Sequence, residues 1–290
     1  MSAASVPLEL PVRPGRSRVL ARLVRKPPAV VALVVVALLV IGAAGASVIA
    51  PYSPTGNDYL HLFAPPTWPH PFGTDELGRD LLTRILYGGR TSLEIAAAAT
   101  GIAMVFGTLW GFVAAFREGF VGDALMRVAD AVMGMPVILL GLVLVAAFGA
   151  SAVSLIFILG VLFAPATARL ARAALLTELH SEYYLAAVAV GARGRRIVLG
   201  ELFPNTVPVL LARATLVAAD AIFVEASLSF VGLGVQPPGT SWGTLLQQGY
   251  TNIYRSIWYP IFPGIVILVA VLALNTLGDN LQRVLDPARS

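Results

Sequence analysis

The sequence contains no cysteine and little charge. Lys, Arg, Asp and Glu make up 12% of its 290 residues, whereas hydrophobic residues make up 57%. Because soluble domains carry about 25% charged residues, this chain has too little polar surface to cover itself in water. Its mean hydropathy of +0.81 agrees, and we expect an integral membrane protein. The absence of cysteine excludes disulfides, zinc–thiolate sites and iron–sulfur clusters.

Lysine and histidine are also rare. Lys26 is the single lysine, and no Gly-Lys-Ser/Thr sequence occurs, so the chain has no P-loop for ATP. His61, His70 and His180 lie far apart in the sequence, which argues against a histidine metal site. No grouping of Ser, His and Asp has the pattern of a hydrolytic site. We therefore expect a chain that is not an enzyme and that holds no metal or cofactor of its own.

Six apolar segments predict an all-α membrane protein, because a helix crosses a bilayer in about 20 residues. The segments are 29–50, 95–116, 131–148, 152–172, 206–231 and 257–278. Residues 1–28 form a basic arm, and residues 29–290 are expected to be one transmembrane domain. Its polar parts are the outer segments 51–90 and 232–256 and an inner loop, 176–205.

The basic residues indicate orientation. The sequence pI is 9.7, but the arginines flank apolar runs, so the expected partner is the lipid bilayer and not nucleic acid. With both termini in the cytoplasm, only four of the 20 basic residues fall outside, namely Arg79, Arg84, Arg90 and Arg255. Basic residues are enriched in cytoplasmic loops, so this orientation is the expected one.

Glycine, proline and hydroxyl residues predict where helices make close contacts, bend or begin. Gly107 and Gly111 form a small-xxx-small pattern that lets two helices approach closely. Pro136 is expected to bend the third segment. Thr74 is expected to cap a short outer helix before the second segment, and residues 241–252 are expected to form a short interfacial helix.

The fifth segment carries three charges, Arg213, Asp220 and Glu225. Ionisable groups inside a bilayer are costly and usually face a bundle interior or a water-filled path. Arg213 and Asp220 are seven residues apart, so at about 100° per residue they share nearly one helix face. We expect them to line the pathway or the bundle interior; the alternative for Arg213 is snorkelling to the cytoplasmic interface. Glu225 is expected to pack inside the bundle.

The inner loop contains EYYLAAVAVGARGRRIVLGELFPN, residues 182–205. Its first nine residues include good helix formers, Gly191 permits a turn, and residues 197–203 predict a second short helix that ends at Pro204. The bland alternative is an ordinary loop that its arginines keep inside the cell.

This loop resembles the cytoplasmic "EAA" loop of binding-protein-dependent ABC permeases, and three other stretches resemble the dipeptide, oligopeptide and nickel branch of that family. Those stretches are GTDELGRD at 73–80, EASLSFVGLGVQPPGTSWG at 225–243 and GDNLQRVLDP at 278–287. The resemblance implies the type I importer permease fold, and it implies that the loop docks on a separate ATPase. The coupling residues implied are Glu182, Ala186, Ala187, Gly191, Arg193 and Pro204. Leu185 departs from the family pattern, since it stands where the glutamate of the triplet is expected.

The resemblance also implies partners and a location. These are a second homologous permease, two cytoplasmic ATPase subunits (or a fused equivalent) that bind ATP and Mg²⁺, and an extracytoplasmic substrate-binding protein. The expected location is the bacterial plasma membrane, with several spans. The main alternative is a secondary transporter driven by an ion gradient, which predicts inverted repeats with broken midplane helices. A membrane anchor or sensor would predict an appended soluble domain. The sequence leaves the substrate open among dipeptides, oligopeptides, nickel chelates, glutathione and haem.

Overall fold

The computed structural model describes residues 23, 25–117, 119–190 and 197–285, and regular structure in this part of the chain is helical. Five helical runs are long and apolar enough to cross a membrane. They are α2 (Pro27–Ala44), α4 (Leu81–Phe116), α7 (Ala152–Leu179), the run Gly200–Leu233 that contains α10 (Phe203–Leu228), and α12 (Trp258–Leu285). The pair α5 (Phe120–Met133) and α6 (Val137–Phe148) makes a sixth candidate if the two helices form one bent span. The expected all-α fold is confirmed.

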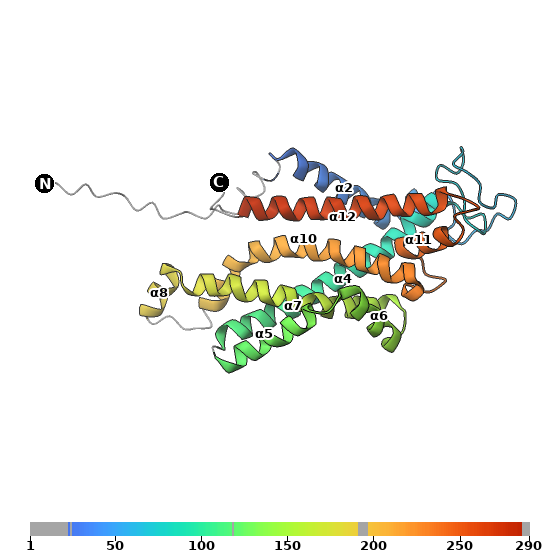
Figure 1. Ribbon diagram of the computed structural model, residues 1–290. Helices are drawn as coiled ribbons and strands as arrows, with labels where there is room; N and C mark the ends of the chain where they lie inside the picture. Colours follow the sequence, from blue (N-terminus) through green and yellow to red (C-terminus); the bar gives the residue numbers. More distant parts are fainter. Residues whose placement is uncertain (1–22, 24, 118, 191–196, 286–290) are drawn as a thin grey trace.

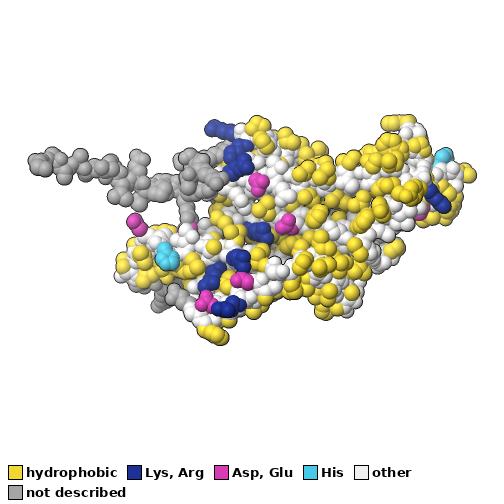
Figure 2. All heavy atoms as spheres, viewed as in Figure 1, with side chains coloured by type: hydrophobic (Ala, Val, Ile, Leu, Met, Phe, Trp, Pro, Cys, Tyr) yellow, Lys and Arg dark blue, Asp and Glu magenta, His cyan; other side chains and the backbone are white. Residues whose placement is uncertain are grey.

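The long helices run side by side from one end of the molecule to the other (Figure 1). One end carries α8 (Glu182–Ala189), and the start of α2 and the end of α12 lie toward it. The opposite end carries α11 (Trp242–Thr251) and the irregular chain before α4. Charged side chains gather toward the α8 end on the visible face, and apolar side chains cover most of the middle (Figure 2). The placement of the α8 end in the cytoplasm stays a prediction.

Glycines hold α4 against α7. A Cβ atom at Gly107 would lie 2.6 Å from the carbonyl oxygen of Ala164, and one at Gly111 would lie 2.8 Å from the Cβ of Ala171. A real Cβ atom essentially never comes this close to another heavy atom, so only glycine lets the two helices approach to this distance. The predicted small-xxx-small contact is confirmed, and its partner is α7.

The second span is longer at its outer end than expected. α4 begins at Leu81, so helix replaces the last ten residues of the predicted outer segment 51–90. The N-cap is Asp80, whose carboxylate accepts a hydrogen bond of 2.7 Å from the backbone N–H of Thr83. The expectation that Thr74 caps a short helix is wrong, because Thr74 is buried in irregular chain and its hydroxyl accepts from the N–H of Ala64 at 2.8 Å.

The third span, predicted at 131–148, is divided into two helices. α5 begins at Phe120, in chain expected to be a loop, and α6 begins at Val137 after a turn of 90°. Pro136 stands at the N-cap of α6. The break lies where the sequence predicts a bend, because proline cannot supply the N–H that a continuous helix needs. Arg169 of α7 forms an ion pair with Asp130 of α5.

The remaining helices extend beyond their predicted limits at the inner end. α7 runs to Leu179 and so enters the predicted loop 176–205, and α12 runs to Leu285. The expected end of a short helix at Pro204 is wrong: the π-helical turn η1 (Val198–Leu202) leads directly into α10, and Pro204 lies in its first turn. A proline is tolerated there because N–H groups of the first turn have no partner within a helix. A second π-helical turn, η2 (Ser229–Leu233), follows α10.

Candidate functional site

A tyrosine ties α8 to both neighbouring helices. The hydroxyl of Tyr183 donates to Oε2 of Glu178 at 2.6 Å, and Nδ2 of Asn205 donates to the Tyr183 hydroxyl at 3.1 Å. Glu178 belongs to the last turn of α7 and is buried, and Asn205 belongs to the first turn of α10. Burial raises the pKa of Tyr183, so the hydroxyl keeps the proton that it donates. The Tyr183 hydroxyl therefore joins α8 to two spans.

One side of α8 packs against an apolar cluster. Its buried members are Ala115, Leu175, Ile197 and Leu202, which come from α4, α7 and the chain around η1. Tyr183, Tyr184 and Ala187 of α8 pack against this cluster. Partial burial of this side of α8 gives the short helix the tertiary support that it needs, because isolated helices of this length are unstable in water.

The opposite side of α8 is exposed and largely apolar. Leu185 is 58% exposed, Val188 50% and Val190 84%, and Ala186 and Glu182 are also exposed. The sequence predicted that Ala186 and Ala187 both present small side chains to a partner. The structure separates them, since Ala187 faces the cluster and Ala186 the outside. Gly191 and Arg193 lie outside the described residues.

Two of the three charges in α10 are half-buried and have no ion-pair partner in the part of the chain that the structure describes. Arg213 and Asp220 attract each other electrostatically, but no ion pair within 4 Å involves either of them among the described residues. The Nε atom of Arg213 is enclosed and has no hydrogen-bond partner in that part of the chain. Their assignment to the pathway stays a prediction.

Glu225 is fully buried and well hydrogen bonded. Its carboxylate accepts from the hydroxyl of Ser92 in α4 at 3.2 Å and from that of Ser229 in η2 at 2.8 Å. The Ser92 oxygen in turn accepts from the backbone N–H of Trp242, the first residue of α11, at 3.1 Å. This arrangement holds α4, α10 and α11 together, which is the packing role expected from the sequence.

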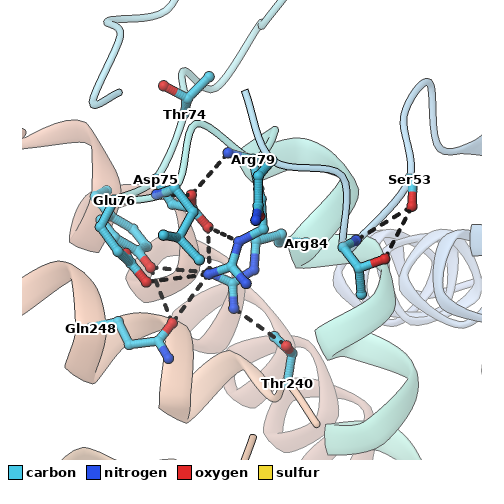
Figure 3. A network of polar contacts seen from close by, with 12 residues as sticks. Ser53, Thr74, Asp75, Glu76, Arg79, Arg84, Thr240 and Gln248 are labelled. Carbon is cyan, nitrogen blue, oxygen red and sulfur yellow. Dashed lines mark hydrogen bonds and ion pairs between the residues drawn. The ribbon is translucent and has the colours of Figure 1, made fainter. Parts of the chain in front are cut away.

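A buried ion pair organises the outer end (Figure 3). Asp75 is fully buried, and its Oδ2 accepts from Nη1 of Arg84 at 2.6 Å and from Nε of Arg79 at 2.7 Å. Arg84 also donates to the hydroxyl of Tyr259 in α12 at 3.1 Å and to Oε1 of Gln248 in α11 at 3.3 Å. The irregular outer segment is thereby joined to three helices.

The sequence analysis missed this network and the tyrosine bridge. The sequence gives no contact for Asp75 and places Arg84 only among the basic residues on the outer side. The GTDELGRD motif did carry a signal, because Gly73 and Gly78 have positive φ values of 79° and 73°, and their turns bring Asp75 back toward α4. The structure also brings two histidines together, since the ring centroids of His61 and His70 are 6.4 Å apart. No group of three or more metal-binding side chains occurs among the described residues.

A family model matches most of the chain. The model of the binding-protein-dependent transport system inner membrane component matches residues 107–290. The chain belongs to this family. The N-terminal transmembrane domain of oligopeptide transport permease C matches residues 16–66. The protein is therefore an inner-membrane permease, a non-catalytic component of a system that has a binding protein and an ATPase. Family membership sets aside the secondary-transporter and membrane-anchor alternatives.

Curated relatives cover nearly the whole permease. The di/tripeptide transport system permease protein DppC of Pseudomonas aeruginosa is 38% identical over 86% of this chain and 84% of its own length. A putative peptide transport system permease protein of Brucella suis is 39% identical over 92% and 90%. The dipeptide transport system permease protein DppC of Escherichia coli is 38% identical over 91% and 90%.

A solved structure has the same fold. A chain of the MetNI methionine ABC transporter, in an inward-facing conformation, matches with a TM-score of 0.57. The match covers 70% of this permease and 96% of that chain, at 21% identity. This likeness confirms the expected importer permease fold, and at this identity it carries no further information on function.

Proposed function

We propose that this permease forms the membrane pathway of an ATP-driven importer of short peptides, and that the exposed side of α8 docks on the ATPase. The relatives support the substrate class, since their names refer to peptides, dipeptides and di/tripeptides. The observation that carries the docking site is the two-sidedness of α8. One side is fixed to two spans through Tyr183, and the other presents Leu185, Ala186, Val188 and Val190 to a partner.

The complete transporter in this proposal contains three kinds of subunit besides this permease. A second homologous permease completes the pathway, and two ATPase subunits, or one fused chain, bind ATP and Mg²⁺ on the cytoplasmic side. A substrate-binding protein delivers the peptide from outside. When ATP binding closes the ATPases, they displace α8, and the bridge from Tyr183 to Glu178 and Asn205 passes the movement to α7 and α10.

Cysteine crosslinking tests the docking side directly, because the chain has no native cysteine. In the assembled transporter, Ala186→Cys is expected to crosslink to the ATPase and not to the binding protein. Ala187→Cys is the matched control, since it makes the same change one residue away on the side that faces the cluster. Equal crosslinking at both positions, or a crosslink to the binding protein, would contradict the docking proposal.

Two further variants test coupling through the same element. Tyr183→Phe removes the hydroxyl that joins Glu178 to Asn205, and Gly191→Val places a β-branched side chain after α8, where the sequence predicts a turn. Both are expected to preserve the amount of permease in the membrane and to lower stimulation of ATP hydrolysis by the loaded binding protein. Normal stimulation of ATP hydrolysis in both variants would contradict a coupling role and favour an ordinary cytoplasmic loop.

A further inference from the structure

Two opposite charges lie symmetrically about the middle of the α10 span. The apolar run extends from Gly200 to Leu233, so its midpoint falls between residues 216 and 217. Arg213 precedes this midpoint and Asp220 follows it by the same number of residues, which places each about 5 Å from the midpoint along the helix axis. Both charges therefore lie well inside this apolar run, where an unpaired ionisable group is costly.

The two side chains share one side of the helix. They are separated by seven residues, or about two turns, and a rise of about 1.5 Å per residue puts their Cα atoms roughly 10.5 Å apart along the axis. Between them, Val217 on one flank of this side is fully buried, whereas Leu216 on the other flank is only half-buried. Arg213 and Asp220 are only half-buried in this chain, so each has a part that faces out of the bundle.

Neither charge is satisfied by the described part of the chain. Glu225, the third charge of α10, accepts two serine hydroxyls. Arg213 and Asp220 have no such partners there; they attract each other across a gap wider than an ion pair, and the Arg213 Nε has no acceptor. A half-buried charge without a partner is costly, and the exposed part of each side chain is available to a partner from outside the chain.

We propose that Arg213 and Asp220 bind the two ends of a zwitterionic peptide in transit. The guanidinium of Arg213 binds the terminal carboxylate, and the carboxylate of Asp220 binds the terminal ammonium. The inference rests on the proposed peptide import and adds the site and the orientation. Arginine suits its role because its planar fork binds a carboxylate through two parallel hydrogen bonds.

The spacing selects short peptides. An extended chain spans at most about 3.3–3.6 Å per residue, so a tripeptide reaches about 10 Å and a dipeptide about 7 Å. These lengths fit two charges whose backbone positions are about 10.5 Å apart, because the Arg213 and Asp220 side chains extend from the helix toward the two ends of the peptide. Longer peptides would have to bend or leave one end free.

The order of the charges sets the direction of travel. Arg213 is nearer the end of α10 that adjoins η1 and α8, and Asp220 is nearer the end that adjoins η2 and α11 (Figure 1). With the α8 end in the cytoplasm, a peptide held by this pair enters with its carboxyl end leading.

Peptides with one blocked end test the assignment in the full transporter. Uptake into proteoliposomes is measured for trialanine, trialanine amide and N-acetyl-trialanine, each at a concentration that saturates the binding protein, and is divided by ATP hydrolysed. Loss of one charged hydrogen-bonding partner predicts a fall of roughly tenfold. Arg213→Gln is expected to lower uptake of trialanine and N-acetyl-trialanine and to leave trialanine amide at the wild-type level. Asp220→Asn is expected to lower uptake of trialanine and trialanine amide and to leave uptake of N-acetyl-trialanine at the wild-type level.

Matched controls make the same chemical changes elsewhere. Arg283→Gln and Asp279→Asn alter exposed residues near the inner end of α12, and all three peptides should keep wild-type uptake. Equal losses for all three peptides in Arg213→Gln or Asp220→Asn, with less assembled complex, would overturn the inference and assign the charges to contact with the second permease. A wild-type transporter that hydrolyses ATP but takes up none of the peptides would overturn the proposed function as well.

Discussion

The buried ion pair at the outer end predicts a large loss of stability when one partner is neutralised. The Asp75 carboxylate accepts four hydrogen bonds, two from the backbone N–H groups of Leu77 and Arg79 and two from the side chains of Arg79 and Arg84. Asp75→Asn keeps an oxygen for the backbone donors but removes the charge that faces two guanidinium groups. Arg84 is only 4% exposed, so water cannot replace the lost partner.

The magnitude follows from this burial. Breaking a buried ion pair by removing one partner costs about 3–5 kcal/mol, because the other charge stays buried without compensation. For a protein of this size, about 1 kcal/mol corresponds to about 2–4 °C in the midpoint of thermal unfolding, so the expected fall is roughly 6–20 °C. The measurement is the temperature at which the detergent-purified permease loses its monodisperse peak in size-exclusion chromatography.

A second ion pair on the same helix provides the control. Arg90 and Glu94 of α4 are joined at 3.1 Å, but their side chains are 56% and 66% exposed. Exposed pairs contribute about 0–1 kcal/mol, so Glu94→Gln should shift the midpoint by less than about 4 °C. If Asp75→Asn and Glu94→Gln give the same shift, burial does not set the strength of the Asp75 network, and the reasoning fails.

Two further predictions concern packing and topology. Gly111→Ala should reduce the yield of folded permease, because the added methyl group would lie 2.8 Å from a side chain of α7, whereas Gly101→Ala should not, because no atom lies within 4 Å of its added methyl group; equal yields would contradict the packing of α4 on α7. An impermeant thiol reagent should label Tyr254→Cys in intact cells and Val190→Cys only after the membrane is opened, since both positions are highly exposed but lie at opposite ends of the bundle. The reverse pattern would invert the topology.

The sequence alone determined the class of protein and the approximate location of its apolar helices. Long apolar runs are a local property, and in a bilayer each run must form a helix because the backbone has no water to bond with. The contact of Gly107 and Gly111 with another helix was also predictable, because small residues spaced by four identify an interface wherever the partner lies. Family motifs such as GTDELGRD then identified the transporter type from the order of residues alone.

Only the tertiary structure decided which side chains meet. Arg84 bonds to Gln248 and Tyr259, which are more than 160 residues away in the sequence, and neither motif nor periodicity identifies that pairing. The structure likewise separated Ala186 from Ala187, because the sides of a short helix are distinguished by what packs beneath it. Spans are determined by the local preference of the chain for lipid, whereas buried polar contacts depend on how those spans are arranged in space, and that arrangement is a property of the whole bundle.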